Sequence, residues 1–159
     1  MRIEKHSYCE EHMSKYNLES LKQLDEITCY VDASTITKYA EASGDHNRIH
    51  YDEKFARTTE FGGIIAHGMF TLNLISQMLD LKFGMDWLVG GSLKVKFKGA
   101  ARLDDIIHSW GSLKSIKPQD EKMILTLDIG VKNRKDLSEL ITGTAIIKME
   151  RSRVDENTE

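Results

Sequence analysis

The sequence predicts an α+β fold in which one long buried helix lies against a curled antiparallel sheet. Residues 69–83 (MFTLNLISQMLDLKF) carry apolar side chains on nearly every helical face, which is typical of a buried helix. Residues 92–99 (SLKVKFKG) alternate apolar and polar side chains with the period of a strand. Strand-type runs without intervening helices favour an antiparallel sheet with one face in water. The further runs cover residues 106–116, 122–131 and 139–149, separated by the turn-type segments 117–121 (KPQDE) and 133–138 (NRKDLS).

The first half of the chain predicts a short strand and a short helix. Residues 26–31 (EITCYV) form a β-branched and aromatic run, as strands do. Residues 32–43 (DASTITKYAEAS) place apolar side chains three and four positions apart, which is helical spacing. Asp32 or Ser34 can cap the first turn, and Gly44 can end the helix in the left-handed conformation. The residues that follow Gly44 therefore lie in a loop.

Length and composition limit the class of protein. The chain has 159 residues, about the size of one domain, and we divide it into a polar arm (1–20), a single domain (21–150) and a polar tail (151–159). A net charge of −3 gives no basic surface for nucleic acid. No apolar run is long enough for a membrane span or a secretory signal, and Cys9 and Cys29 make no disulfide framework. We expect a cytoplasmic protein.

The N-terminal arm contains a pattern that resembles a metal site. His6, Cys9 and His12 recur every three residues. Zinc needs four protein ligands in structural sites, or three and a water in catalytic ones, and no fourth ligand is nearby. The alternative is an exposed helical face, and we predict no metal.

The loop after Gly44 contains the candidate catalytic residues. In a helix, Asp45 and His50 would lie on different faces, but in a loop they can converge. A carboxylate beside an imidazole can hold and activate one water molecule. The alternative is that Asp45 and Asn47 only form turns, and that His50 is an ordinary loop histidine.

Two stretches of sequence carry a resemblance to a known family. Residues 43–56 (SGDHNRIHYDEKFA), followed by 61–69 (FGGIIAHGM), resemble the hydratase motif of the MaoC-like dehydratase family, in particular the (R)-specific 2-enoyl-CoA hydratases. A weaker resemblance runs from about residue 27 to 147. The family usually has proline where this chain has Arg48, and we expect its loss to soften the loop. The matching residues are Ser43, Gly44, Asp45, Asn47, Ile49, His50, Ala56, Ala66, His67, Gly68 and Met69.

The resemblance implies a hot-dog fold and an activity. A curved sheet would wrap the long helix, and the chain would hydrate trans-2-enoyl-CoA to (R)-3-hydroxyacyl-CoA, reversibly. Asp45 and His50 would activate one water, and the backbone N–H of Gly68 would form the oxyanion hole. A serine that only bonds its own helix is the alternative for Ser76. The supporting residues implied by the resemblance are Asn47, Ser76 and His67.

The reaction also limits cofactors and partners. It requires no metal or redox cofactor, and coenzyme A enters only as the carrier of the substrate. Members of this family form dimers, so the resemblance implies a homodimer. Possible interface or acyl-tunnel residues are Trp87, Leu88 and Val89; possible contacts to coenzyme A phosphates, or simply the wet face of a strand, are Lys94, Lys96 and Lys98.

The sequence leaves three rival functions open. The same site could dehydrate 3-hydroxyacyl thioesters of an acyl carrier protein in fatty acid or polyketide assembly. Hot-dog proteins also include thioesterases, against which the two-part motif argues. A non-catalytic subunit that binds acyl thioesters, or one half of a heterodimer, is a third alternative. Retention of both Asp45 and His50 argues against it, whereas Arg48 leaves it open.

Overall fold

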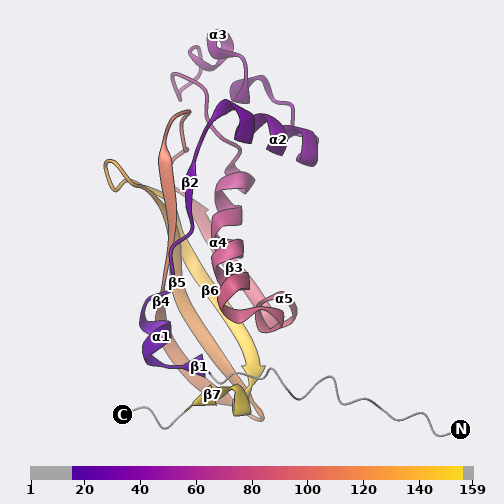
Figure 1. Ribbon diagram of the computed structural model, residues 1–159, viewed down its shortest axis with the longest axis vertical. Helices are drawn as coiled ribbons and strands as arrows, with labels where there is room; N and C mark the ends of the chain where they lie inside the picture. The colour runs from indigo at the N-terminus through magenta and orange to yellow at the C-terminus, as the bar shows by residue number, and fades with distance from the viewer. Residues whose placement is uncertain (1–15, 156–159) are drawn as a thin grey trace, which may run out of the picture.

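A five-stranded antiparallel sheet and one long helix make up the body of the computed structural model, which describes residues 16–155. Helix α4 (Gly68–Phe83) runs along one face of the sheet (Figure 1). The arrangement confirms the predicted α+β class with its long central helix. In spatial order the strands are β2 (Thr28–Tyr30), β4 (Ile106–Gln119), β5 (Lys122–Asn133), β6 (Glu139–Glu150) and β3 (Gly91–Phe97).

Helix α4 buries one side rather than all of its surface. Its buried residues recur three and four positions apart, so they form one stripe that faces the sheet. On the other side, Met69 is 59% exposed and Leu81 is 71% exposed. The sequence predicts burial on every side of this helix. In the single chain, only the side that faces the sheet is buried. The buried stripe comprises Thr71, Leu74, Ile75, Met78, Leu79 and Phe83.

Helix α2 (Ala33–Ser43) begins and ends as predicted. The Asp32 carboxylate accepts a hydrogen bond from the Thr35 backbone N–H at 2.6 Å, so it caps the first turn. At the other end, Gly44 has φ 74° and donates its N–H to the Ala40 carbonyl at 2.9 Å. A residue with a Cβ is disfavoured at this left-handed position, which explains the glycine.

Short elements after α2 gather beyond one end of the sheet. The 3₁₀ helix η1 (Arg48–His50) and helix α3 (Glu53–Ala56) follow the loop, and the chain then returns to α4. Figure 1 places α2 and α3 together at the end of α4 where that helix begins. The motif loop and the start of the long helix therefore meet.

The turn between β4 and β5 is shorter than predicted. Strand β4 continues through Pro118 to Gln119, so only Asp120 and Glu121 of the turn-type segment form the turn. Proline cannot donate to a strand neighbour, but β2 pairs with β4 only up to His108. On the side of β4 away from β5, Pro118 therefore has no neighbouring strand whose hydrogen bonds it could break.

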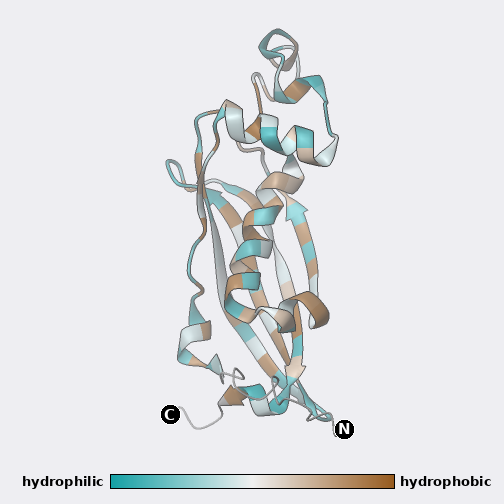
Figure 2. Cartoon of the chain, turned by 45° about the vertical axis from the view of Figure 1, so that its right-hand side comes forward, coloured by the Kyte–Doolittle hydropathy of each residue, from teal (hydrophilic) through white to brown (hydrophobic). Residues whose placement is uncertain are grey.

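Helix α5 (Met85–Gly90) is not predicted by the sequence. Of the expected interface residues that it carries, one packs inward and two are exposed. A Cβ on Gly91 would lie 2.1 Å from a Trp87 ring atom, so the indole folds back onto the start of β3. In contrast, Leu88 is 65% exposed and Val89 is 79% exposed. Figure 2 shows α5 coloured as hydrophobic along most of its length.

The two ends of the described chain pair with each other. Strands β1 (Tyr16–Asn17) and β7 (Val154–Asp155) form a parallel pair, next to helix α1 (Glu19–Lys22) and the 3₁₀ helix η2 (Arg151–Arg153). The division into arm, domain and tail stays a prediction, and His6, Cys9 and His12 lie outside the described residues. Within residues 16–155, no helix is long and apolar enough to cross a membrane.

Candidate active site

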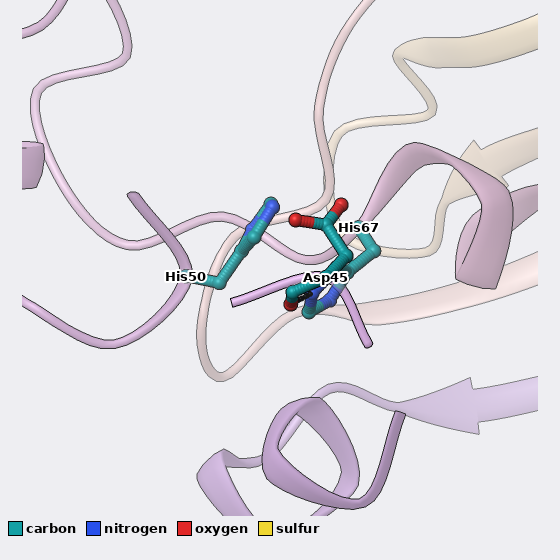
Figure 3. A group of neighbouring side chains, drawn as sticks. All are labelled: Asp45, His50 and His67. Atoms are coloured by element: carbon teal, nitrogen blue, oxygen red, sulfur yellow. Dashed lines mark hydrogen bonds between the residues drawn. The ribbon is translucent and has the colours of Figure 1, made fainter. Parts of the chain in front are cut away.

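The structure brings Asp45, His50 and His67 together. One carboxylate oxygen of Asp45 and one ring nitrogen of each histidine lie within 4.8 Å of one another. Asp45 is exposed, whereas His50 is 8% and His67 only 2% exposed. In Figure 3 the Asp45 carboxylate lies beside the His50 ring nitrogen, with His67 next to both. The convergence of Asp45 and His50 that the loop makes possible is therefore present.

A backbone carbonyl fixes the tautomer of the His50 ring. Its Nδ1 lies 2.8 Å from the carbonyl oxygen of Ile65. A carbonyl can only accept, so Nδ1 carries the hydrogen and donates it. In the neutral ring, the lone pair is then on Nε2, which can act as a base. The main chain just before α4 thus leaves Nε2 of the neutral His50 ring as a hydrogen-bond acceptor.

His67 joins the motif loop to the start of α4. Its Nε2 donates to the backbone carbonyl of Asp45 at 2.9 Å. Its ring stacks on that of His50, with centroids 3.7 Å apart, and contacts Tyr39 with centroids 4.9 Å apart. His67 Nδ1 is buried and has no hydrogen-bond partner among the described residues.

Successive short-range hydrogen bonds hold the motif loop. The Ser43 hydroxyl accepts from the Asp45 N–H, and a carboxylate oxygen of Asp45 accepts from the Asn47 N–H, each at 3.2 Å. The Asn47 side chain then accepts from the N–H of Ile49 at 3.2 Å. Such side-chain turns fix the backbone locally. They orient Asp45, and the amide oxygen of Asn47 bonds within the loop; its supporting role stays a prediction.

Arg48 binds within the loop. Its Nη2 lies 2.7 Å from an Asp52 carboxylate oxygen, and its guanidinium carbon lies 4.7 Å from the centre of the Phe55 ring. The hydrogen bond from Arg48 is the largest cause that lowers the pKa of Asp52. Asp52 also caps α3 by accepting from the Phe55 N–H at 3.0 Å. The arginine therefore ties η1 to α3 where the family pattern has a proline.

The N-terminus of α4 presents a backbone donor beside the cluster. The first hydrogen bond of this helix runs from Thr71 N–H to His67 carbonyl. The N–H of Gly68 has no partner in the part of the chain that the structure describes. Unpaired N–H groups at a helix start favour negative charge. Gly68 can therefore stabilise an oxyanion.

Hollows surround the cluster, and we name each after one residue. The Asp45 hollow has a volume of about 420 Å³, the Lys98 hollow about 310 Å³ and the His46 hollow about 430 Å³. The Asp45 hollow is lined by Tyr39, Ser43, Asp45, His67, Gly68, Met69 and Phe97. The Lys98 hollow is lined by Phe61, Ile65, Ala66, Gly68, Thr71, Phe97, Lys98, Gly99 and Ala100. The His46 hollow is lined by Ile36, Thr37, Ala40, Glu41, His46, His50 and Tyr51.

Other predicted site residues lie farther out. Ser76 lines none of these hollows, and its hydroxyl accepts from the Trp87 indole N–H at 3.4 Å rather than bonding its own helix. Its supporting role stays a prediction. Lys94 and Lys96 alternate with residues that pack on the core, so they project from the other face of β3, whereas Lys98 borders a hollow.

Ile65, Tyr39 and Phe97 were not recognised from the sequence. Ile65 acts through its carbonyl, which any residue supplies, so its side chain gave no signal. The sequence pattern places Tyr39 only in a helical stripe and Phe97 only in a strand. Their contacts with His67 and Gly68 join residues far apart in the chain.

Comparisons with known proteins identify the family of this chain. The family model described as "MaoC like domain" matches residues 17–129. A 3-hydroxybutyryl-CoA dehydratase of Methylorubrum extorquens is 29% identical over 119 residues, which are 75% of this chain and 73% of the relative. An (R)-specific enoyl-CoA hydratase of Rhodospirillum rubrum is 29% identical over 89 residues, covering 56% and 62%.

Solved structures show the same fold. The (R)-hydratase from A. caviae, described as involved in PHA biosynthesis, superposes with a TM-score of 0.68 at 24% identity, over 81% of this chain and 96% of that one. The MaoC-like dehydratase from Rhodospirillum rubrum gives a TM-score of 0.69 at 22% identity, over 81% and 90%. The hot-dog fold is thereby confirmed. With the family model matching most of its length, this chain belongs to the MaoC-like domain family of hydratases and dehydratases.

Proposed function

We propose that this chain hydrates trans-2-enoyl-CoA to (R)-3-hydroxyacyl-CoA and catalyses the reverse dehydration. The observation that supports this most is the fixed tautomer of His50 beside the Asp45 carboxylate. Because Ile65 accepts the Nδ1 hydrogen, the His50 Nε2 can accept a hydrogen from water. An Asp45 oxygen can accept the other hydrogen of that water.

The reaction balances with water alone. The water oxygen bonds to C3 of the enoyl thioester, and the Asp45–His50 pair takes a proton from that water. A proton returns from the pair to C2, so the pair ends unchanged. Held by both residues, the water delivers its OH and its H to one face of the double bond. The (R) product is assigned from the relative named (R)-specific enoyl-CoA hydratase. A positioned acid–base group of this kind contributes about 10²–10⁴ in rate.

Gly68 serves the other end of the conjugated system. As the C3–O bond forms, negative charge develops on the thioester oxygen. The unpaired Gly68 N–H at the start of α4 donates to that oxygen, and such a donor contributes about 2.7–4 kcal/mol. Glycine permits the thioester to approach the backbone closely. Lys98, in the adjoining hollow, attracts phosphates of the coenzyme A carrier.

The function is tested with crotonyl-CoA by following the loss of the conjugated enoyl absorbance. We expect turnover by the natural chain and a loss of about 10²–10⁴ in kcat for both Asp45→Asn and His50→Ala. The matched control is His46→Ala, since His46 is an exposed histidine of the same loop. Chiral analysis of the product tests the (R) configuration.

Absence of turnover would contradict the proposal. If the folded protein hydrates no enoyl-CoA of any chain length, the hydratase assignment is wrong for coenzyme A substrates. The same assay with thioesters of an acyl carrier protein then decides between a carrier-protein dehydratase and a non-catalytic binding subunit.

The proposed enzyme is a homodimer. Strand β3 ends the sheet order, so one side of its backbone has no strand partner among the described residues. Beside it, α5 exposes Met85 (66%), Leu88 (65%) and Val89 (79%). An open edge next to an apolar surface suits a second copy of the chain. Sedimentation equilibrium should give a dimer mass, and Val89→Glu should lower it. Leu137→Glu should not, because this exposed leucine lies in the turn before β6, at the other end of that strand from α5. A monomeric natural chain would contradict this.

A further inference from the structure

Two residues, Gly68 and Phe97, line both the Asp45 hollow and the Lys98 hollow. One hollow contains Asp45 and His67, and the other contains Thr71 and Lys98. The two spaces therefore meet at the backbone donor of the proposed oxyanion hole. What stands between them there is the aromatic ring.

The Phe97 ring lies directly against Gly68. A Cβ built on Gly68 would be 3.2 Å from Cε1 of Phe97, so the ring occupies the space that any larger residue would need. Phe97 is the last residue of the edge strand β3 and is 49% exposed. The wall between the hollows at Gly68 is thus a single ring.

This position gives Phe97 a consequence for the substrate. A thioester whose oxygen accepts from the Gly68 N–H must lie beside the ring. The acyl chain and the carrier then leave the thioester in opposite directions, and the ring limits how far either can spread from one hollow into the other. A longer acyl chain needs the ring to move, whereas a short one does not.

We infer that Phe97 is a specificity-determining residue that sets the length of acyl chain accepted, by separating the two hollows at Gly68. The inference rests on the proposed hydratase function, since it uses the Gly68 N–H as the thioester site. Phe97 has no polar group and takes no part in the proton transfers. Its substitution should therefore change the preference among substrates more than the chemistry.

The test compares kcat/KM for crotonyl-CoA, 2-hexenoyl-CoA and 2-octenoyl-CoA in Phe97→Ala, Phe97→Trp and the natural chain. Joining the hollows in Phe97→Ala should raise the octenoyl-to-crotonyl ratio about tenfold, since a methylene in an apolar pocket changes specificity by that order. Phe97→Trp should lower the ratio. Ser92→Ala is the control, because Ser92 lies on the same strand with its side chain on the face opposite to Phe97, and it should leave the ratio unchanged.

The outcomes separate this inference from the proposed function. If the natural chain hydrates crotonyl-CoA and Phe97→Ala keeps the natural ratio, the role of Phe97 is wrong and the hydratase stands. If no variant shows turnover, calorimetric Kd values for saturated butyryl-CoA and octanoyl-CoA replace the kinetics. A change of their ratio in Phe97→Ala alone supports the wall between the hollows without the hydratase; an unchanged ratio overturns it.

Discussion

Replacing Arg48 with proline, the residue usual in the family pattern, tests how this chain holds the motif loop. The backbone is already suited to proline. Asn47 has φ −63° and ψ 130°, the extended conformation that precedes proline. Arg48 opens η1, where φ is about −50 to −70°, and its N–H has no partner among the described residues. The substitution therefore breaks no backbone hydrogen bond.

The expected change in the free energy of unfolding is a small difference between opposing effects. Proline restricts the unfolded chain and stabilises by about 0.4–1 kcal/mol. Loss of the guanidinium contact with Phe55 costs about 0.5–1 kcal/mol at an exposed site. The exposed pair with Asp52 adds a screened contribution of the same sign. We expect Arg48→Pro to lie within about 1 kcal/mol of the natural chain.

Arg48→Ala provides the comparison that makes this decisive. Alanine loses the same side-chain contacts without the restriction from proline, so it should be less stable than Arg48→Pro by about 0.4–1 kcal/mol. Urea unfolding followed by circular dichroism, at one protein concentration, measures both. A proline variant less stable than the alanine variant would refute this account of the loop.

The same variants have a predictable pH dependence. The folded pKa of Asp52 is depressed, so its ionised form stabilises the fold above the ordinary aspartate pKa of 3.8, and that stability is lost as pH falls through the folded value. Arg48 is the largest cause of the depression. The difference between the natural chain and Arg48→Pro should therefore shift in favour of the proline variant as pH falls below about 4.

Three more predictions follow from the geometry. Gly68→Ala keeps the backbone N–H but pushes the Phe97 ring by tenths of an ångström, so kcat/KM should fall while urea unfolding shows stability unchanged or raised. Burial lowers the pKa of His108 below 6.5, so the unfolded chain takes up the proton first as pH falls. The free energy of unfolding should therefore decrease as pH falls below about 6.5. Urea unfolding at several pH values should show a flatter decline in His108→Gln. Chelation with EDTA should leave hydratase activity unchanged, although Asp45 and its two histidine neighbours are potential metal ligands; a loss reversed by added Zn²⁺ would contradict a metal-free mechanism.

Features encoded by near neighbours in sequence could be predicted. The cap of α2 joins Asp32 to Thr35, three residues away, and Gly44 closes the same helix through Ala40, four residues away. Strand periodicity needs only alternating residues. In contrast, α5 has six residues and begins after Gly84, at φ 50°, and its packing depends on the Trp87 ring lying over Gly91. Six residues are too few for a helical period to show in the sequence.

The candidate site divides in the same way. Asp45 is oriented by hydrogen bonds from residues two positions away, and the motif alone is enough to place it in the loop. The two histidines are oriented across the chain: His50 by Ile65, fifteen positions later, and His67 by Asp45, twenty-two positions earlier. The identity of these histidines could be read from the sequence, but the ring nitrogen left free on each could not.

In the proposed mechanism, one short segment from Ile65 to Gly68, at the start of α4, positions the acting groups. The Ile65 carbonyl fixes the tautomer of His50, His67 supports the Asp45 backbone, and Gly68 supplies the proposed oxyanion donor, all within four residues. None of these contributions needs the side chain of Ile65. A backbone shift in residues 61–67 would therefore rotate His50, move Asp45 and displace the oxyanion donor together, because one stretch of main chain positions all three.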